Sequence, residues 1–545
     1  MENYLTKLSE TAKQRWDGKA VCDYGGYSLT FHETAEKIWK LHYIFRQCGI
    51  NKGNRISICA HNSANWAVAF LASNTFGAAS VLLHSELNAE SVCRLAAHSG
   101  SMVLFTDTEI FGKLDINALK GIKTVINCRD MTLLYCEDYH ILKAFDDAEG
   151  ALRKEFPQGM TSTDLRWIGM DGEDIAVINY TSGTTGDPKG VMISCRALST
   201  VVEFASSKIP CNAGESIVSM LPMGHIYGFA FEFLYPLCNG ATVHFLGRTP
   251  SPTRLLQAVK ETQPYLICTV PLVMEKICKT TIMPALSKPA MRVAAAIPGI
   301  RLIAYRKVRK SVHKAFGGRV REFVIGGAAL NPEVEKCFQK IRLNYTVGYG
   351  MTEAAPLIAF SNWRDYVPGS CGRCIDCANI RIESEDPLRI PGEILAKGGN
   401  MFSGYLDNPK ATAGAFTEDG YFRTGDLGTI DRNGNIFIKG RSKCMILTAS
   451  GQNIYPEEIE AVVNSQECVA ESMVVERNRS LVALVLFDKD ELDRRHREDR
   501  QALLELICRR SNDSLPGYCK ISKAEEVDKP FEKTLKMSIK RKPYQ

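Results

Sequence analysis

Alternating strand and helix patterns constrain the fold of this chain more than any other feature of its sequence. A capping box that begins at Thr30 predicts a helix through Arg46. A short apolar strand over 55–60, a helix over 66–75 and a second strand over 78–83 follow it. Because strands separated by helices usually pair in parallel, this order favours an α/β fold in which helices cover a parallel sheet.

The middle of the chain continues this pattern. Apolar runs predict buried strands over 175–180, 191–194 and 215–221. Four aromatic residues then stand at every second position, namely Phe229, Phe231, Phe233 and Tyr235. This period of two predicts a strand, whereas the proline and glycine that follow leave a buried helix as the alternative.

The length of 545 residues exceeds what one compact core accommodates, so two or more packing units are expected. The composition changes near residue 440, after a turn-rich sequence at 431–435. Beyond that point the sequence predicts a helix over 457–464 and a strand over 480–487. We therefore predict a large N-terminal α/β domain with several sheets over 1–440 and a small C-terminal α+β domain over 441–545.

Composition narrows the class of protein. The chain has 67 Lys and Arg against 61 Asp and Glu, and a net charge of +6 does not by itself imply a nucleic-acid partner. No window predicts a membrane-spanning helix, and the first residues lack a secretory pattern. The 19 cysteines are scattered and odd in number, which is typical of reduced thiols. We expect a cytoplasmic enzyme that binds no nucleic acid.

The segment 180–190 follows a buried strand and combines four hydroxyls, three glycines and one lysine. Glycines let backbone amides approach a phosphate chain, hydroxyls donate to its oxygens, and Lys189 supplies a positive charge. It is not a Walker A loop, since Pro188 precedes the lysine and Gly190 follows it. The segment therefore predicts phosphate binding, and the alternative is a polar hairpin between two strands.

Further motifs follow this segment in a fixed order, at 221–225, 326–330, 347–353, 392–409, 421–428, 439–443 and 451–460. The ordered series resembles the adenylate-forming (AMP-binding) superfamily, which includes acyl-CoA synthetases, peptide-synthetase adenylation domains and firefly luciferase. The segment 451–460 is most similar to bacterial medium- and long-chain fatty acyl-CoA synthetases. The resemblance covers essentially the whole chain.

The resemblance implies a nucleotide site with Mg²⁺. The nucleotide residues would be Thr181, Ser182, Gly183, Thr184, Thr185, Lys189, Gly327, Ala328, Gly348, Tyr349, Gly350, Thr352, Asp426, Arg441 and Lys443. By the same resemblance, Tyr349 would stack on adenine and Asp426 would accept from the ribose hydroxyls. Thr184 and Glu353 would hold Mg²⁺, which prefers oxygen ligands. The catalytic residues would be Lys189, His225, Thr352, Glu353 and a C-terminal lysine.

The resemblance also implies two half-reactions. A carboxylate attacks the α-phosphorus of ATP to form an acyl-adenylate, and the thiol of coenzyme A then displaces AMP. Between the two steps the C-terminal domain would swing about a hinge near Lys443. Phe229 and Phe233, in a stretch that would line the acyl tunnel, suggest an apolar acid of medium or long chain. The alternatives are a ligase that passes the acyl group to an acyl carrier protein and a homologue that binds nucleotide or lipid without adenylation.

The C-terminus departs from the family pattern. Relatives end in a segment whose last lysine reaches the α-phosphate, and the matching position here is Ser538. A serine cannot supply that positive charge. Lys536 and Lys540 stand two residues to either side, and we predict that Lys540 or, failing that, Lys536 takes the role.

Two other segments have more than one interpretation. Cys371, Cys374 and Cys377 have the spacing of part of an iron–sulfur site, but a fourth ligand is missing, and an ordinary loop is the preferred interpretation. The segment 301–321 holds eight basic residues and no acidic one, and it predicts an amphipathic helix. We interpret it as a solvated surface helix, with peripheral contact to an anionic inner membrane face or to the CoA phosphates as the alternative.

Overall fold

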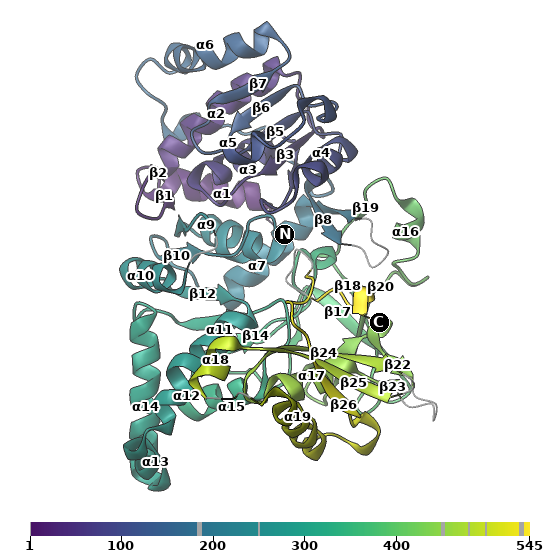
Figure 1. Ribbon diagram of the computed structural model, residues 1–545. Helices are drawn as coiled ribbons and strands as arrows, with labels where there is room; N and C mark the ends of the chain where they lie inside the picture. The colour runs from purple at the N-terminus through teal and green to yellow at the C-terminus, as the bar shows by residue number, and fades with distance from the viewer. Residues whose placement is uncertain are drawn as a thin grey trace.

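The structure is a computed structural model that describes residues 2–182, 188–248, 251–447, 453–477, 480–495, 497, 499–533 and 539–544. Its elements form a large N-terminal unit and a small C-terminal unit (Figure 1).

An eight-stranded sheet organises the N-terminal unit, in the order β19-β9-β8-β4-β3-β5-β6-β7. Its strands are β3 (Arg55–Cys59), β4 (Ala79–Leu82), β5 (Val103–Thr106), β6 (Thr124–Asn127), β7 (Leu133–Cys136), β8 (Ile175–Ser182), β9 (Pro188–Ser194) and β19 (Gly404–Tyr405). The five central strands, from β8 to β6, run parallel, and the outer ones are antiparallel. The predicted parallel sheet is therefore confirmed.

Two further sheets complete the N-terminal α/β arrangement. The four-stranded sheet consists of β10 (Ser216–Ser219), β11 (Thr242–Phe245), β1 (Lys19–Asp23) and β2 (Ser28–Thr30), and the parallel three-stranded sheet of β12 (Leu266–Thr269), β13 (Glu322–Ile325) and β14 (Tyr345–Val347). The helix α3 (Ala64–Thr75) contacts β1, β3 and β4, and all twelve of its residues are buried. It therefore fills the core between two of the sheets.

The longer helices cover these sheets. They are α1 (Tyr4–Gln14), α2 (Phe31–Gln47), α4 (Ala89–His98), α6 (Tyr139–Glu155), α7 (Cys195–Lys208), α10 (Pro252–Thr262), α14 (Pro298–Ala315) and α15 (Pro332–Ile341). The capping box predicted at Thr30 is present at the start of α2: the Glu33 amide donates to the Thr30 hydroxyl, and the Glu33 carboxylate accepts from the Thr30 amide.

The aromatic stretch after His225 is helical, so the strand predicted from its alternation is wrong and the helix alternative is confirmed. It forms α8 (Ile226–Gly228), a wide helical turn over Phe229–Leu234 and α9 (Tyr235–Cys238). The rings of Phe229 and Phe233 pack against Trp66 and Phe70 of α3. Their side chains are therefore part of the core between α3 and this helix.

An antiparallel sheet precedes the C-terminal unit. Its strands are β17 (Ala378–Glu383), β18 (Gly392–Gly398), β20 (Phe422–Ile430) and β21 (Ile436–Arg441). The C-terminal unit consists mainly of β24 (Val469–Arg477), β25 (Ser480–Phe487), β26 (Lys523–Glu526), α17 (Pro456–Asn464) and α19 (Arg500–Ser514). The predicted strand over 480–487 and the predicted helix over 457–464 are both present, and the mixture is α+β, as expected.

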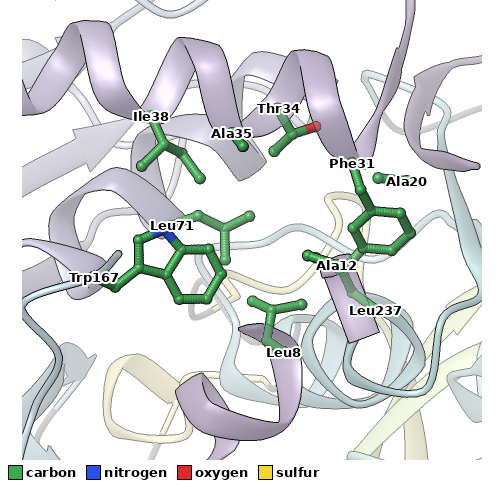
Figure 2. A pocket seen from close by; sticks show the side chains of 10 residues that line it. All are labelled: Leu8, Ala12, Ala20, Phe31, Thr34, Ala35, Ile38, Leu71, Trp167 and Leu237. Carbon is green, nitrogen blue, oxygen red and sulfur yellow. The ribbon is translucent and has the colours of Figure 1, made fainter. Parts of the chain in front are cut away.

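A small apolar cavity lies in the N-terminal core. Figure 2 shows Leu8, Ile38, Leu71 and Trp167 among the side chains that point into it from α1, α2, α3 and a loop. Its volume of about 10 Å³ is on the scale of one water molecule, too small for an acyl chain. It is a packing gap rather than a substrate site.

Candidate functional site

The predicted phosphate segment joins two antiparallel strands. Thr181, at the end of β8, is the register partner of Lys189 on β9. Gly183, Thr184 and Thr185 lie outside the described residues, as does the side chain of Ser182. The topology of this segment is therefore a hairpin between β8 and β9, and a hairpin is compatible with phosphate binding.

One tyrosine links Lys189 to Glu353. The ammonium of Lys189 lies 4.9 Å from the centre of the Tyr405 ring, and the Tyr405 hydroxyl donates to Glu353 Oε1 at 3.1 Å. Tyr405 reaches this position because β19 pairs with β9, with Tyr405 opposite Val191. The Lys189 ammonium and the Glu353 carboxylate, which are 164 residues apart in sequence, therefore both contact the Tyr405 side chain.

Backbone contacts position Glu353. Thr352 and Glu353 are buried in a short 3-10 turn, Thr352–Ala354, and the Glu353 carbonyl accepts from the Phe402 amide at 2.8 Å. This hydrogen bond joins the turn to the segment that leads into β19. The turn that carries Glu353 and the segment that leads to Tyr405 are therefore fixed to each other.

A second cluster is formed by Tyr349, Asp426 and Arg441. The Tyr349 hydroxyl donates to Asp426 Oδ2 at 2.8 Å, and Arg441 Nε lies 2.7 Å from Oδ1. Asp426 and Arg441 are register partners on β20 and β21. Burial raises the pKa of Asp426, while the Arg441 charge and the Tyr349 hydrogen bond oppose that shift.

Tight turns stand between these clusters. A side-chain carbon at Gly350 would lie 1.8 Å from the Pro356 carbonyl oxygen, so only glycine fits there. Gly327 has φ +89°, and the nearest atom to an added Cβ would be Val270 Cγ1 at 3.9 Å, which leaves space beside it. Ala328 follows that turn after β13, and Gly348 follows β14.

The loop that carries His225 is held by buried polar side chains. Asn62 donates to the Leu221 carbonyl and accepts from the Met223 amide, and Asn179 donates to the Gly224 carbonyl at 2.7 Å. Glu232 Oε2 accepts from the amides of Met220 and Leu221. The loop is therefore fixed along its length.

His225 faces a second histidine. The rings of His84 and His225 are 4.8 Å apart, centre to centre, and meet edge to face. His84 follows β4, and burial lowers its pKa. Since the carboxyl ends of β4 and β8 lie at the same edge of the parallel sheet, both His84 and Thr181 stand where α/β sheets bind ligands.

The two phenylalanines that suggested an apolar acid do not carry that inference, because both lie in the aromatic core against α3. Tyr227 has a different position. Its ring lies 3.1 to 3.4 Å from where a Cβ on Gly326 would stand, and its hydroxyl donates to the Val324 carbonyl. Tyr227 is therefore the aromatic residue of this helix that adjoins the turn expected beside adenine.

The hinge segment lies between β21 and α17. Lys443 is in a 3-10 turn, Ser442–Cys444, directly after Arg441. Lys439 Nζ lies 3.0 Å from Glu458 Oε1, so the last strand of the antiparallel sheet is joined to α17 of the C-terminal unit.

Lys540 lies apart from these clusters in sequence and contacts. Its ammonium is 3.7 Å from Glu532 Oε2, and its side chain is half-exposed. The adjacent Arg541 is largely buried, with Nη2 2.6 Å from Glu460 Oε2. Lys536 and Ser538 lie outside the described residues.

The donor set at Glu353 fits Mg²⁺ bound together with phosphates. Mg²⁺ in nucleotide sites is held by one or two carboxylates and by phosphate oxygens, rather than by a protein cage. Glu353 is one buried carboxylate beside the Lys189 cation. The described residues contain no group of three or more His, Cys, Asp or Glu side chains gathered for a metal.

Comparison with known proteins decides the family. The AMP-binding enzyme family matches residues 8–406, and the AMP-binding enzyme C-terminal domain matches residues 444–545. The chain belongs to the AMP-binding enzyme family. It is an adenylate-forming protein of the acyl- and aryl-CoA ligase superfamily, and the resemblance drawn from the motifs is confirmed.

Relatives cover most of the chain. The long-chain-fatty-acid–CoA ligase FadD15 of Mycobacterium bovis is 28% identical, over 85% of this chain and 78% of that protein. The chloroplastic long-chain-fatty-acid–acyl-carrier-protein ligase AEE15 of Arabidopsis thaliana is 24% identical, over 92% of this chain and 78% of that protein. The ATP-bound crystal structure of MatB from Rhodopseudomonas palustris has a TM-score of 0.78 at 21% identity, over 99% of this chain and 97% of that chain. That likeness shows the fold.

Several residues of the site were not predicted individually. Tyr405 lies in the motif segment 392–409, yet nothing in its local sequence indicates that it contacts both Lys189 and Glu353. Asn179 and Glu232 could have been noticed as polar residues in apolar runs, since buried polar groups need partners. Asn62 gives no such signal, because it stands between His61 and Ser63.

Proposed function

We propose that this chain activates a medium- or long-chain fatty acid with ATP and transfers the acyl group to coenzyme A. The carboxylate of the acid attacks the α-phosphorus of ATP, pyrophosphate leaves, and an acyl-adenylate forms. The CoA thiol then attacks the acyl carbon, loses its proton, and AMP leaves. The observation that carries the proposal is the Lys189–Tyr405–Glu353 arrangement beside the phosphate hairpin.

In this proposal the chain positions reactants and neutralises charge, since no protein nucleophile is needed. Lys189, Thr181 and the hairpin residues 182–185 bind the phosphates, and Thr352 donates to the α-phosphate. Asp426 and Arg441 hold the ribose, Tyr349 adjoins the adenine, and Gly327, Ala328, Gly348 and Gly350 form the turns around it. His225, oriented by Asn62, Asn179 and Glu232 through its loop, lies beside the carboxylate of the acid.

Glu353, with Thr184, would hold Mg²⁺. The ion would supply positive charge to the phosphate oxygens when bound. Tyr405 orients the Glu353 carboxylate through its hydroxyl.

The choice of a fatty acid and of CoA is supported by the relatives. FadD15 is a long-chain-fatty-acid–CoA ligase, and AEE15, of similar coverage, is a ligase for an acyl carrier protein. The second candidate is therefore transfer to an acyl carrier protein. A homologue that binds nucleotide or lipid without adenylation is the third.

The test is an assay of AMP release that depends on ATP and CoA, across saturated acids of graded length with an aromatic acid as comparison. We expect the longer saturated acids to be turned over faster than the aromatic acid. A higher rate with a carrier protein than with CoA would favour the second candidate. If no acid supports pyrophosphate exchange, the proposal is wrong, and the homologue that binds nucleotide or lipid without adenylation is favoured.

A matched pair of variants tests the carrying observation. Lys189→Ala should abolish most exchange, because the charge beside the phosphates is lost. Lys410→Ala removes an exposed lysine five residues after Tyr405 and should leave exchange unchanged.

We also propose a cytoplasmic enzyme with peripheral contact to an anionic membrane. Within the part of the chain that the structure describes, no helix combines the length and apolar character that crossing a bilayer requires. The contact would use the basic helix α14.

A further inference from the structure

Exposed aliphatic side chains are concentrated at one end of the molecule. Fourteen large apolar side chains are exposed among the described residues, and five of them lie within the eleven residues 293–303. These five are Val293, Ile297, Ile300, Leu302 and Ile303, with Val293 66% and Ile303 71% exposed. They belong to α13 (Pro289–Ala296), the first turns of α14 and the junction between the two. This group is called the apolar tip below.

The apolar tip lies at the periphery of the fold. Figure 1 shows α13 at the outer end of α14, away from the eight-stranded sheet. Farther along α14, Ala304, Val308 and Val312 are buried, and the helix contacts α10 and α15. The second half of α14 is therefore anchored to the body, and its first turns carry the tip outwards.

The charge around the tip is of one sign. The segment 276–321 contains twelve Lys and Arg and no Asp or Glu. Because the whole chain carries +6, the remainder carries −6. Lys307, Lys310 and Lys314 are exposed on α14 behind the tip. The apolar tip is thus followed by a basic stem on a chain that is otherwise acidic.

The exposed aliphatic side chains of α14 cover one broad face of its first turns. Successive residues of an α-helix are rotated by about 100°, so Ile300 and Ile303 lie about 60° apart and Leu302 lies about 100° from Ile303. The exposed residues that follow on the same helix include the lysines of the basic stem. An anionic bilayer surface binds exposed aliphatic area together with neighbouring lysines, so this combination favours a lipid surface over an acidic protein, for which the charge alone would suffice.

We propose that the apolar tip inserts into the interfacial region of an anionic phospholipid bilayer, with the basic stem held at the charged headgroups. Interfacial binding of this kind depends on buried apolar area together with attraction of Lys and Arg to anionic lipid. Insertion of a specific tip goes beyond the surface contact of a basic helix. Its use, which rests on the proposed function, is to hold the enzyme where apolar acids partition.

The test is flotation of the full chain with vesicles of phosphatidylcholine, with or without phosphatidylserine, in the absence of ATP, acid and CoA. We expect binding to the phosphatidylserine vesicles that weakens as salt is raised. Because no substrate is present, loss of the proposed activity would not alter this readout. Equal or absent binding to both kinds of vesicle would overturn the proposal.

Two variants separate the apolar and charged contributions. Ile300→Gln, Leu302→Gln and Ile303→Gln together should reduce the partition coefficient by more than about tenfold. Lys307→Glu, Lys310→Glu and Lys314→Glu together should do the same. The matched controls are Leu388→Gln with Ile390→Gln, and reversal of the exposed Lys120, Lys143 and Lys154, which should bind as the wild type does.

Insertion itself has a direct readout. The indole of Ile303→Trp should be quenched by lipids with brominated acyl chains, whereas that of Leu388→Trp should not. If the glutamine variant binds like the wild type and the indole at 303 is not quenched, attraction to the surface remains but insertion is wrong. If vesicles do not bind and an acidic carrier protein does, the lipid surface is the wrong partner.

Discussion

The hydroxyl of Tyr349 donates a 2.8 Å hydrogen bond to one oxygen of Asp426, while Arg441 occupies the other oxygen at 2.7 Å. The carboxylate is buried, so these two donors offset the burial that raises its pKa. Each carboxylate oxygen has a further lone pair. Asp426 can therefore accept the ribose hydroxyl that we propose for it without releasing Tyr349 or Arg441, and the Tyr349 hydrogen bond orients the carboxylate.

Asp426→Ala should raise the ATP concentration needed for half-maximal pyrophosphate exchange by more than about tenfold, since a charged acceptor is lost. Tyr349→Phe keeps the ring and the Arg441 contact, and should raise it by only a few fold. Tyr366→Phe, which removes a partly buried hydroxyl that donates to Glu335, is the control and should leave the ATP requirement unchanged. If neither Asp426→Ala nor Tyr349→Phe alters ATP handling, the nucleotide site is misplaced.

Glu353→Ala should weaken the response of exchange to added magnesium, because it removes the proposed carboxylate ligand. Tyr405→Phe preserves the ring under Lys189 but removes the hydrogen bond to Glu353, and should shift the magnesium titration in the same direction by less. Magnesium titrations of both variants at saturating ATP measure this. An unchanged magnesium midpoint in Glu353→Ala would contradict the assignment.

Patterns of period and capping predicted the elements whose surroundings agree with their local sequence, such as α2 with its capping box and β25 with its apolar run. The strand predicted around Phe229 and Phe233 was wrong, because residues four apart share a face in a helix as well as in a strand. Their packing against Trp66 and Phe70 of α3 is a tertiary contact that the local period does not contain.

The site was predictable where motifs are contiguous and not where it depends on pairing between distant strands. Lys189 and Glu353 were identified from their segments. Tyr405 joins them only because β19 pairs with β9, a contact between residues more than 200 positions apart. No local pattern around Tyr405 contains that information.

Lys443→Pro should impair thioester formation while largely sparing pyrophosphate exchange. Proline restricts φ in the turn between β21 and α17, where rotation of the C-terminal unit is expected. Single-turnover formation of acyl-CoA from preformed adenylate, compared with exchange, measures the two steps separately. Lys443→Ala serves as the control for loss of the side chain alone. Equal losses in both steps for Lys443→Pro would contradict a hinge at this position.

His42 should make stability sensitive to mild acid. Burial lowers its pKa from 6.5 to about 4, and its Nε2 lies 3.0 Å from both the Ala72 carbonyl and the Thr75 hydroxyl. The folded state therefore holds the neutral ring, and between pH 6.5 and 4 the unfolded state binds more protons. Stability is unaffected above that window and falls as pH falls through it, by about 3 kcal/mol for this group.

Urea unfolding of the wild type and His42→Gln, at about pH 7 and about pH 4.5, measures this. The stability difference between the two proteins should shrink at the lower pH, since glutamine does not titrate. Parallel loss of stability in both proteins would show that other groups dominate.

Lys540 and Arg541 are neighbours with different surroundings, and this difference allows the adenylating lysine to be tested. Lys540 is half-exposed in a 3.7 Å pair with Glu532, whereas Arg541 is buried against Glu460. Exposed pairs contribute less than about 1 kcal/mol, so little holds the Lys540 side chain where it is. Lys540→Ala should therefore leave the unfolding temperature unchanged. If Lys540 is the adenylating lysine, the same variant should lose most pyrophosphate exchange.

Arg541→Ala should instead lower the unfolding temperature, because it leaves a buried carboxyl at Glu460 without its cation. Glu532→Gln removes the partner of Lys540 and should leave both exchange and unfolding unchanged. Loss of exchange only in a Lys536→Ala variant would transfer the role to that residue. Full exchange by a variant that lacks both Lys536 and Lys540 would exclude both lysines. If the wild type shows no exchange, the remaining candidate is the homologue that binds nucleotide or lipid without adenylation.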